Sequence, residues 1–549
     1  MLQGQLQRAD AGYRAAGSIE RVQLPASVQS VIAARIGRLS EEDRSVLQIA
    51  SVIGANVPQP LLAALVPHSA EALDDVLARL TRSDFLFELQ SFPTVEYSFK
   101  HAMTQQVAYD SLTSSGRRML HRETLRAMER LHPDQLHDLA EKLADHAFRA
   151  EEWDAAATYL VQAADKAVDL SAYAKAARWL EQAVQAVDSL PESPERDRRA
   201  VDVRTRMRPV YDATGSFAKA ATRLQEAKAL ASGLDDVERL FQVLIHQSYL
   251  YSSHGRIEEA LAAADELRDL ARANGAERYA CEADLAAAQA LLMRADATTA
   301  LKHLEPHYDR FAGEWRHDRF GLLGTRAVWY LGHFSFAKAL LGDFEAADRA
   351  AAESAHIAEE VGRPFDILAA RYCGALVEIV RGPAPEFVAG LRCVVGDRHT
   401  EAAASFRPWL TGVLGHAEYA TGEYAAACET LQQAAAEAAT FDLPQFEAYA
   451  RALGACACSM LPGRAHEADL DAALDLARQR KDLWIEVTVL RAMADQATGD
   501  ARVGLLEQAR DTAEQAGLRA EAVRARAANA SAPMAVSMLC AVRRWSRAG

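Results

Sequence analysis

The sequence lacks the usual signatures of several enzyme classes. It has no Gly-Lys dipeptide, so the phosphate-binding loop G-x-x-x-x-G-K-[ST] is absent. It has neither a G-x-G-x-x-G dinucleotide fingerprint nor a G-x-S-x-G elbow around a serine. No H-E-x-x-H pair of metal-ligating histidines occurs. We therefore expect a chain that is not an enzyme, with no catalytic residues, no cofactor and no metal site.

Cysteine is scarce, and its positions show no paired motif. The chain has seven cysteines, an odd number, without a C-x-x-C motif, and its first residues do not resemble a secretory signal. No window reaches 18 apolar residues, so no membrane span is expected. These features predict a cytoplasmic, reducing location. Free cysteines in helices should then behave as small apolar residues, with Cys456 and Cys458 on different sides of one helix.

Aromatic residues make up only 7% of the chain, whereas alanine is abundant. Because alanine has the highest helix propensity and allows helices to approach closely, an all-α fold is expected. The 549 residues are too many for one compact core, so more than one domain is predicted. The net charge of −15 disfavours nucleic-acid binding by the chain as a whole.

A glycine followed by spaced apolar residues recurs along the chain. Its clearest copy comprises Gly215, Phe217, Ala220, Leu224 and Ala227. Further copies follow Gly255, Gly342 and Gly422, and one beginning at Ala297 lacks the glycine. The period is about 40 residues, which is typical of stacked helix pairs.

Each copy has a simple physical interpretation. An upstream helix ends at the glycine, which adopts a left-handed conformation without strain. A downstream helix follows, and its small residues allow the two helices to cross closely. One pair cannot bury both of its faces, so the pairs should stack into a right-handed α-solenoid superhelix resembling lengthened tetratricopeptide (TPR) repeats.

A different pattern precedes the repeats. Helical spacing from Leu24 to Leu80 is followed by two aromatic and β-branched runs, 85–89 and 94–99, which predict a β-hairpin. Helices followed by a two-stranded wing match the plan of a winged helix. The connector that follows contains four histidines at irregular spacing, which we expect to be solvated or to cap helices: His121, His132, His137 and His146.

Two segments of this region, Leu24–Gly54 and Val95–Leu112, resemble the winged helix of STAND-type signalling ATPases. The similarity is greatest to the bacterial family that combines a class III adenylate cyclase, an AAA-like ATPase and a TPR tail, with MalT-like LuxR-type regulators as relatives. Gly37 departs from that family's usual acidic residue. The resemblance implies these domains: 1–22, a polar tail left from an absent ATPase module; 23–115, the winged helix; 116–150, a helical connector; 151–530, TPR-like repeats; and 531–549, a flexible tail.

The predicted helix before the hairpin, Ala70–Leu80, carries three acidic residues and one arginine. A DNA-reading helix would be basic, so nucleic-acid binding is not expected.

The upstream helices of the repeats offer a groove for a partner. By analogy with TPR proteins, protein partners or a small effector would contact Gln242, Tyr249, Trp329, Phe336, Trp409, His416 and Tyr419. These aromatic residues could instead simply pack between repeats.

Three functional hypotheses follow. The first is a non-catalytic regulatory or scaffold module of a signal-transduction ATPase, which acts on an ATPase or cyclase module upstream or in trans. The second is a fragment of an adenylate cyclase or AAA-type ATPase that carries the family's name by homology. The third is a LuxR-type transcriptional regulator, which would require a basic C-terminal helix-turn-helix that residues 500–549 do not display.

Overall fold

The computed structural model describes residues 6–9, 12–15, 26–89, 95–170, 172–319, 322, 324–396, 406–462 and 467–529. The chain forms two compact units. The first comprises residues 1–163 and 185–190, and the second comprises residues 164–184 and 191–549. The predicted flexible tail, 531–549, lies outside the described residues, as does most of the predicted polar tail.

The first unit combines short helices with a small sheet. Strands β1 (Leu6–Ala9) and β2 (Gly12–Ala15) pair as an antiparallel hairpin in the predicted polar tail. A second sheet has the order β3-β5-β4. The strands of this sheet and the helices around it follow one another along the chain in this order: α1 (Ala26–Gly37), α2 (Glu41–Ile53), β3 (Asn56–Pro58), α3 (Gln59–Ala63), α4 (Ala70–Arg82), β4 (Leu86–Leu89), β5 (Glu96–Phe99) and α5 (Ala102–Asp110).

The predicted hairpin is present as β4 and β5, which pair antiparallel with Leu86 opposite Phe99. Strand β3, which was not predicted, adds to the other edge of β5. Its three residues are too few to show a strand period, so only the tertiary structure places them in the sheet. Ser40 caps α2 by accepting a hydrogen bond from the Asp43 backbone N–H at 3.0 Å.

Three helical elements follow in this unit: α6 (Ser114–Leu131), the 3₁₀ turn η2 (Pro133–Gln135) and α7 (Ala140–Arg149). His137 is exposed and His132 caps α6, as predicted. The prediction was wrong for His121 and His146, which are buried with their Nδ1 atoms 2.9 Å apart. Spacing in the sequence could not reveal this pair, because its two members belong to helices that meet only in the fold.

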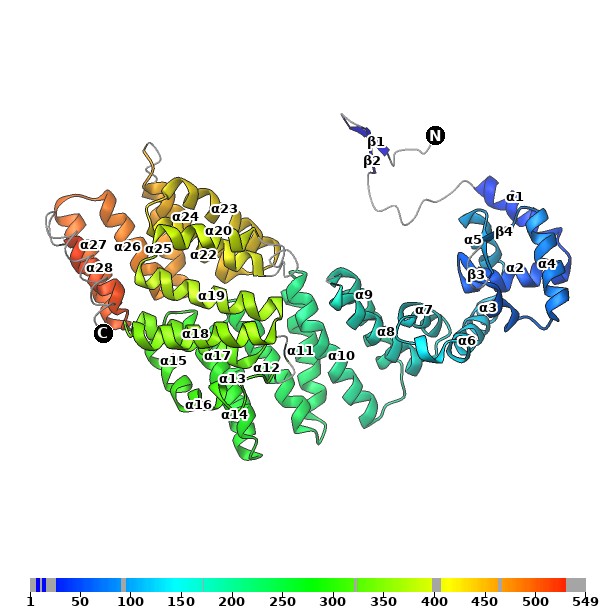
Figure 1. The fold of residues 1–549 in the computed structure, drawn as a ribbon, viewed down its shortest axis with the longest axis horizontal. Coiled ribbons are helices and arrows are strands. Elements are labelled where there is room, and N and C mark those ends of the chain that lie inside the picture. The colour runs from blue at the N-terminus through cyan, green and yellow to red at the C-terminus, as the bar shows by residue number, and fades with distance from the viewer. Residues whose placement is uncertain are drawn as a thin grey trace. The chain divides into compact units, whose positions relative to one another are not determined.

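Helices α8 (Trp153–Asp169) and α9 (Tyr173–Asp188) lead into the repeats. The second unit is then a series of TPR-like helix pairs (Figure 1). Its helices are α10 (Pro194–Ala213), α11 (Phe217–Ser232), α12 (Val237–Ser253), α13 (Ile257–Ala273), α14 (Glu277–Leu292), α15 (Ala297–Leu304), η3 (Glu305–His307), α16 (Tyr308–Ala312), α17 (Arg326–Leu340), α18 (Phe344–Val361), α19 (Pro364–Arg381), α20 (Pro385–Val395), α22 (Arg407–Ala420), α23 (Tyr424–Thr440), α24 (Pro444–Ser459), α25 (Glu467–Arg480), α26 (Leu483–Gln496), α27 (Gly499–Gln515) and α28 (Arg519–Asn529).

The repeat glycines adopt the predicted conformation. Gly215, Gly255, Gly342 and Gly422 have φ between 63° and 83° and lie between the two helices of a pair. In the copy without glycine, Ala295 takes this place with φ 59°. A left-handed conformation at alanine costs about 1–2 kcal/mol, which the packing of α14 against α15 offsets.

The two helices of each pair differ in burial. We call the first member the upstream helix (α10, α12, α14, α17, α19, α22, α24, α26) and the second the downstream helix (α11, α13, α15, α18, α20, α23, α25, α27). Upstream helices such as α12 and α17 are buried on nearly all sides, whereas downstream helices such as α13 bury one stripe. The upstream helices are therefore the interior of the array.

Early and late repeats of the second unit touch at their turns. Gln445, at the start of α24, donates from Nε2 to the Met293 carbonyl after α14 at 3.4 Å. A Cβ on Gly215 would lie 2.6 Å from the Thr440 carbonyl oxygen, so only glycine allows this approach. Arg524 on α28 donates from Nη2 to the Val380 carbonyl on α19 at 2.6 Å. The array thus closes on itself and surrounds its upstream helices.

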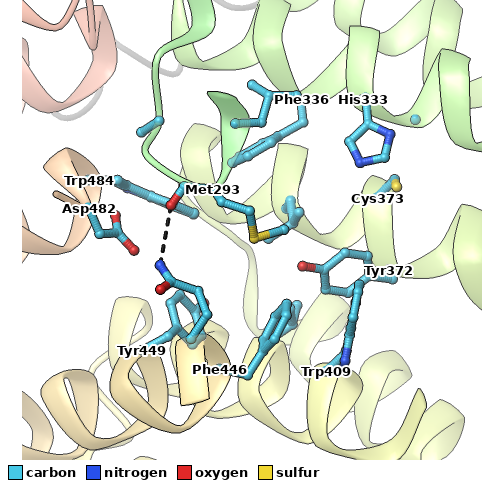
Figure 2. Close-up of a pocket in the computed structure, with 16 residues that line it drawn as sticks. Met293, His333, Phe336, Tyr372, Cys373, Trp409, Phe446, Tyr449, Asp482 and Trp484 are labelled. Atoms are coloured by element: carbon cyan, nitrogen blue, oxygen red, sulfur yellow. Dashed lines mark hydrogen bonds between the residues drawn. The ribbon is translucent and has the colours of Figure 1, made fainter. Parts of the chain in front are cut away.

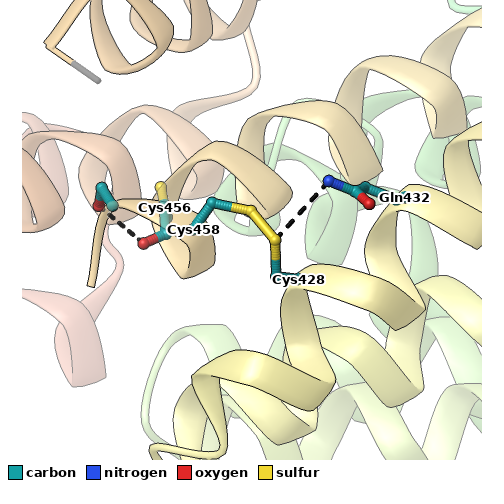
Figure 3. The surroundings of a disulfide bond; sticks show 5 residues. Cys428, Gln432, Cys456 and Cys458 are labelled. Carbon is teal, nitrogen blue, oxygen red and sulfur yellow. Dashed lines mark hydrogen bonds between the residues drawn. A yellow bond between two sulfur atoms is a disulfide. The ribbon is translucent and has the colours of Figure 1, made fainter. Parts of the chain in front are cut away.

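A disulfide joins Cys428 on α23 to Cys458 on α24 (Figure 3). The expectation that all cysteines are free was therefore wrong for these two. They are 30 residues apart, and the packing of a downstream helix on the next upstream helix brings their Cα atoms to 5.4 Å. Cys456 is buried and free.

None of the described helices is both long and apolar enough to cross a membrane.

Candidate functional site

An apolar cavity of about 70 Å³ lies among the upstream helices of the second unit (Figure 2). Helices α14, α17, α19, α22, α24 and α26, or the turns beside them, contribute all of its lining. Apolar atoms dominate the surface. The lining residues are Leu292, Met293, Ala295, Gly332, His333, Phe336, Tyr372, Cys373, Leu376, Trp409, Val413, Gln445, Phe446, Tyr449, Asp482 and Trp484.

Aromatic rings form most of the wall. Trp409 stacks on Phe446 with centroids 4.3 Å apart and meets Tyr372 edge-on at 5.3 Å. Phe336 lies 5.6 Å from Trp484 across the other side. Figure 2 shows Met293 reaching among these rings. Rings held by several helices at once form a rigid apolar surface, which binds a complementary group with little loss of entropy.

A few polar groups lie at the cavity. Asp482 caps α26 by accepting the Ile485 N–H at 3.1 Å. Burial raises the pKa of Asp482 to about 7, partly opposed by hydrogen bonds from backbone N–H groups. Tyr449 Oη lies 2.7 Å from His416 Nδ1. An apolar pocket with a small number of oriented polar groups is typical of a binding site.

The cavity's one thiol is not suited to nucleophilic chemistry. Burial raises the pKa of Cys373 to about 12. The thiolate is the reactive form, so this cysteine stays protonated near neutral pH. Burial also lowers the pKa of His333 to about 4, and its Nδ1 is engaged with the Trp329 carbonyl at 2.7 Å. The arrangement therefore favours binding over catalysis.

The structure brings four of the predicted groove residues together. Phe336 and Trp409 line the cavity directly. Trp329 packs edge-on against Trp409, with centroids 6.4 Å apart. His416 lies against Trp484 at 4.9 Å and contacts the cavity wall through Tyr449.

The other three predicted residues lie elsewhere. Tyr249 is buried, donates to Glu282 Oε1 at 2.7 Å and bonds Arg326. Tyr419 is partly buried beside Tyr424. Gln242 lines a second, polar cavity on α10 and α12. These three are therefore not neighbours of the apolar cavity.

Sequence reasoning missed several wall residues: Met293, Tyr372, Phe446, Tyr449, Asp482 and Trp484. Tyr372, Phe446 and Trp484 belong to α19, α24 and α26, whose repeat pattern is weak. An aromatic residue within the first five positions of every upstream helix from α12 onward was an available signal for Phe446 and Trp484. The closure that brings Met293 to α24 had no signal in the sequence.

No family model matches the sequence. A curated relative, an uncharacterised protein of Rhizobium meliloti (strain 1021), is 27% identical over 200 residues, which cover 36% of this chain and 19% of that protein. The matched region thus spans about a fifth of the relative's length.

Several solved structures resemble the chain at low identity. The Rap protein complexed with competence and sporulation factor has a TM-score of 0.47 at 13% identity, covering 71% of this chain and 98% of that one. A STAND protein with a tetratricopeptide repeat sensor from Pyrococcus horikoshii has a TM-score of 0.38 at 10% identity, covering 96% and 68%. Yeast Tom70 has a TM-score of 0.32 at 11% identity, covering 78% and 94%. Any proposal of function therefore depends on this chain's own residues.

Proposed function

We propose that the second unit is a non-catalytic binding module that receives an apolar side chain of a protein partner, or a small apolar effector, in the aromatic cavity. The observation that carries this proposal is the wall itself. Six successive upstream helices each contribute to one apolar pocket, and four of its rings come from different helices: Phe336, Tyr372, Trp409 and Trp484. A ligand there contacts many repeats at once, so its binding would bias the packing of the whole array.

The same proposal places the chain as a regulatory part of a signal-transduction ATPase. Its support is the resemblance of the first unit to the region behind the ATPase of STAND proteins, together with a sequence that contains no phosphate loop. The first unit runs helix, strand, helix, helix, strand, strand from α2 to β5, which is the order of a winged helix. We propose that it is a winged helix acting as a spacer.

Charge on α4 argues against DNA reading by that unit. Arg79 on α4 is already engaged, because its Nη2 donates to Asp43 at 2.7 Å and to Glu42 at 2.8 Å. The exposed acidic residues of α4 would repel phosphates. A winged helix whose α4 pairs Arg79 within the domain fits an intramolecular role.

The binding test uses the full chain as bait for a random peptide display library. Selected peptides should carry an apolar anchor and bind by calorimetry. Phe446→Ala and Trp484→Ala should each weaken binding at least about tenfold, since truncating a central aromatic contact costs more than about 1.4 kcal/mol. Tyr424→Ala, on downstream helix α23, is the matched control and should bind as the wild type does. Unchanged affinity in both cavity variants would show that the peptide binds elsewhere.

A second measurement tests the regulatory assignment. Purified protein should not hydrolyse ATP, because the phosphate-binding loop G-x-x-x-x-G-K-[ST] is missing from the sequence. Measurable hydrolysis by this chain alone would contradict the assignment.

A further inference from the structure

A second cavity in the same unit has a different chemical character. It has a volume of about 620 Å³ and lies between α10 and α12. The end of α8, Leu180 at the middle of α9, Arg319 and Leu322 complete its wall. Four arginines line it: Arg206, Arg208, Arg239 and Arg319. Its volume lies within the range of roughly 300–1,000 Å³ that is common for small-molecule sites.

The positive charge of this cavity is only partly neutralised. Arg206 pairs with Asp165 at 2.9 Å, and Arg239 pairs with Asp202 at 2.8 Å. Both aspartates also line the cavity, so these two pairs contribute no net charge to it.

Of the remaining two arginines, Arg208 pairs through Nε with Asp212 Oδ2 at 2.9 Å, a carboxylate outside the lining. Arg319 therefore supplies the excess. Arg319 is exposed, donates from Nε to the Leu322 carbonyl at 2.9 Å and forms no ion pair with any carboxylate in the described part of the chain. The pKa of Arg319 is lowered by burial and then by the nearby positive charge of Arg363. An anion placed here would relieve that repulsion.

One deeply buried polar group faces the same cavity. His246 on α12 is 7% exposed and lines the cavity, and its Nδ1 has no hydrogen-bond partner among the described residues. Burial, with Arg208 and Arg326 nearby, lowers the pKa of His246 to about 3. A neutral imidazole can present an N–H to an acceptor oxygen without adding a buried charge. An unpartnered buried nitrogen is costly, and a bound oxygen atom would satisfy it.

We propose that this cavity binds an organic oxyanion, a small molecule that carries a phosphate or carboxylate group. Arginine suits such a ligand because its planar fork donates two parallel hydrogen bonds to either group. Arg319 supplies the uncompensated charge, Arg208 adds a second guanidinium to the wall, and His246 and Gln242 supply neutral polar contacts. Leu180 and Val201, which also line the cavity, cover the apolar body of the ligand. The site is separate from the aromatic cavity and does not depend on it.

The experiment titrates the full chain with three probes by calorimetry and thermal unfolding. Pyrophosphate and adenosine monophosphate represent phosphates, citrate represents carboxylates, and sodium chloride holds the ionic strength constant. At least one probe should bind with a submillimolar Kd and raise the Tm. The class of probe that binds more tightly, phosphate or carboxylate, identifies the acidic group that the cavity recognises.

Two variants locate the binding. Arg319→Gln and His246→Asn should each weaken it at least fivefold. Arg319 is exposed, so its replacement leaves folding intact even where His246→Asn destabilises the chain. Arg371→Gln, an exposed arginine on α19, is the matched control and should not change the Kd. Absence of binding by all three probes would overturn the proposal, as would equal affinity in wild type and Arg319→Gln.

Discussion

Upstream and downstream helices of the second unit come from the same repeat but have different environments. Upstream α17 is buried almost throughout and contains Arg326 and His333 among its buried residues. Downstream α18 buries one stripe, and its Arg349 and Glu345 side chains pair while 62% and 66% exposed. Polar groups on upstream helices are therefore desolvated, and those on downstream helices are screened by water. Changes of charge should act almost entirely through the upstream helices.

The largest expected effect is a loss of stability in acid. Burial lowers the pKa of His246 and His416 to about 3 and that of His333 to about 4. The unfolded chain binds these protons near pH 6.5 and the folded chain does not, so the contribution of these histidines to stability declines as pH falls below about 6.5. Asp482, whose pKa is raised to about 7 in the folded chain, opposes part of this loss. Between pH 7 and pH 5 each histidine costs about 2 kcal/mol, and the three together about 6 kcal/mol.

Urea unfolding at the two pH values, followed by tryptophan fluorescence, measures this loss. The substitutions His333→Gln and His416→Gln should each reduce the loss between pH 7 and pH 5 by about 2 kcal/mol. His356 on α18 has a side chain that is 60% exposed, and His356→Gln should leave the difference as it is. An equal pH dependence in all variants would show that buried histidines are not its source.

A somewhat smaller effect is expected from the buried ion pair between two upstream helices. Glu282 on α14 is fully buried and lies 2.8 Å from Arg326 on α17. Glu282→Gln leaves the guanidinium without its counter-charge, which should cost about 4 kcal/mol in the free energy of unfolding. The downstream control, Glu345→Gln, should cost less than about 1 kcal/mol.

Chemical denaturation of Glu282→Gln and Glu345→Gln measures the difference in free energy of unfolding between a buried and an exposed ion pair. A double variant tests whether the unpaired charge causes that difference. Replacing Glu282→Met and Arg326→Met together should restore most of the lost stability, because no unpaired charge then remains buried. A double variant as unstable as Glu282→Gln would mean that packing, and not charge, makes this position sensitive.

The smallest of the three effects concerns the disulfide that joins a downstream helix to an upstream one. Cys428 and Cys458 are separated by 30 residues, for which loop-closure entropy predicts a stabilisation of about 3.6 kcal/mol. Dithiothreitol should therefore lower the Tm of the wild type and leave that of Cys428→Ser/Cys458→Ser unchanged. The exposed free thiol of Cys393 provides the control, since Cys393→Ser should respond to dithiothreitol as the wild type does. If dithiothreitol does not change the Tm of the wild type, the Cys428–Cys458 disulfide does not stabilise the protein.

Local patterns in the sequence predicted much of this fold. The repeat glycines marked the turns because few other residues tolerate φ near 70° without strain. Alternating aromatic residues marked β4 and β5. Of the candidate site, Phe336 and Trp409 were predicted as groove residues of upstream helices, by analogy with TPR proteins. Phe446 and Trp484 in the cavity wall were missed because α24 and α26 carry weak copies of the repeat.

Pairings between distant segments had no such signal. The His121–His146 contact, the Cys428–Cys458 bond and the pairing of β3 each depend on helices or strands that meet only after folding. The four arginines of the polar cavity likewise come from three separate stretches of chain.

By itself, the sequence determined the all-α repeat architecture, the turn positions and the small residues at helix crossings, because each depends on neighbours within about 40 residues. Only the tertiary structure decided that early and late repeats touch, as Gln445 and Met293 do. That closure converts a row of upstream helices into an enclosed interior. Enclosure removes water, and removal of water produces the aromatic cavity and makes His246, His333 and His416 neutral.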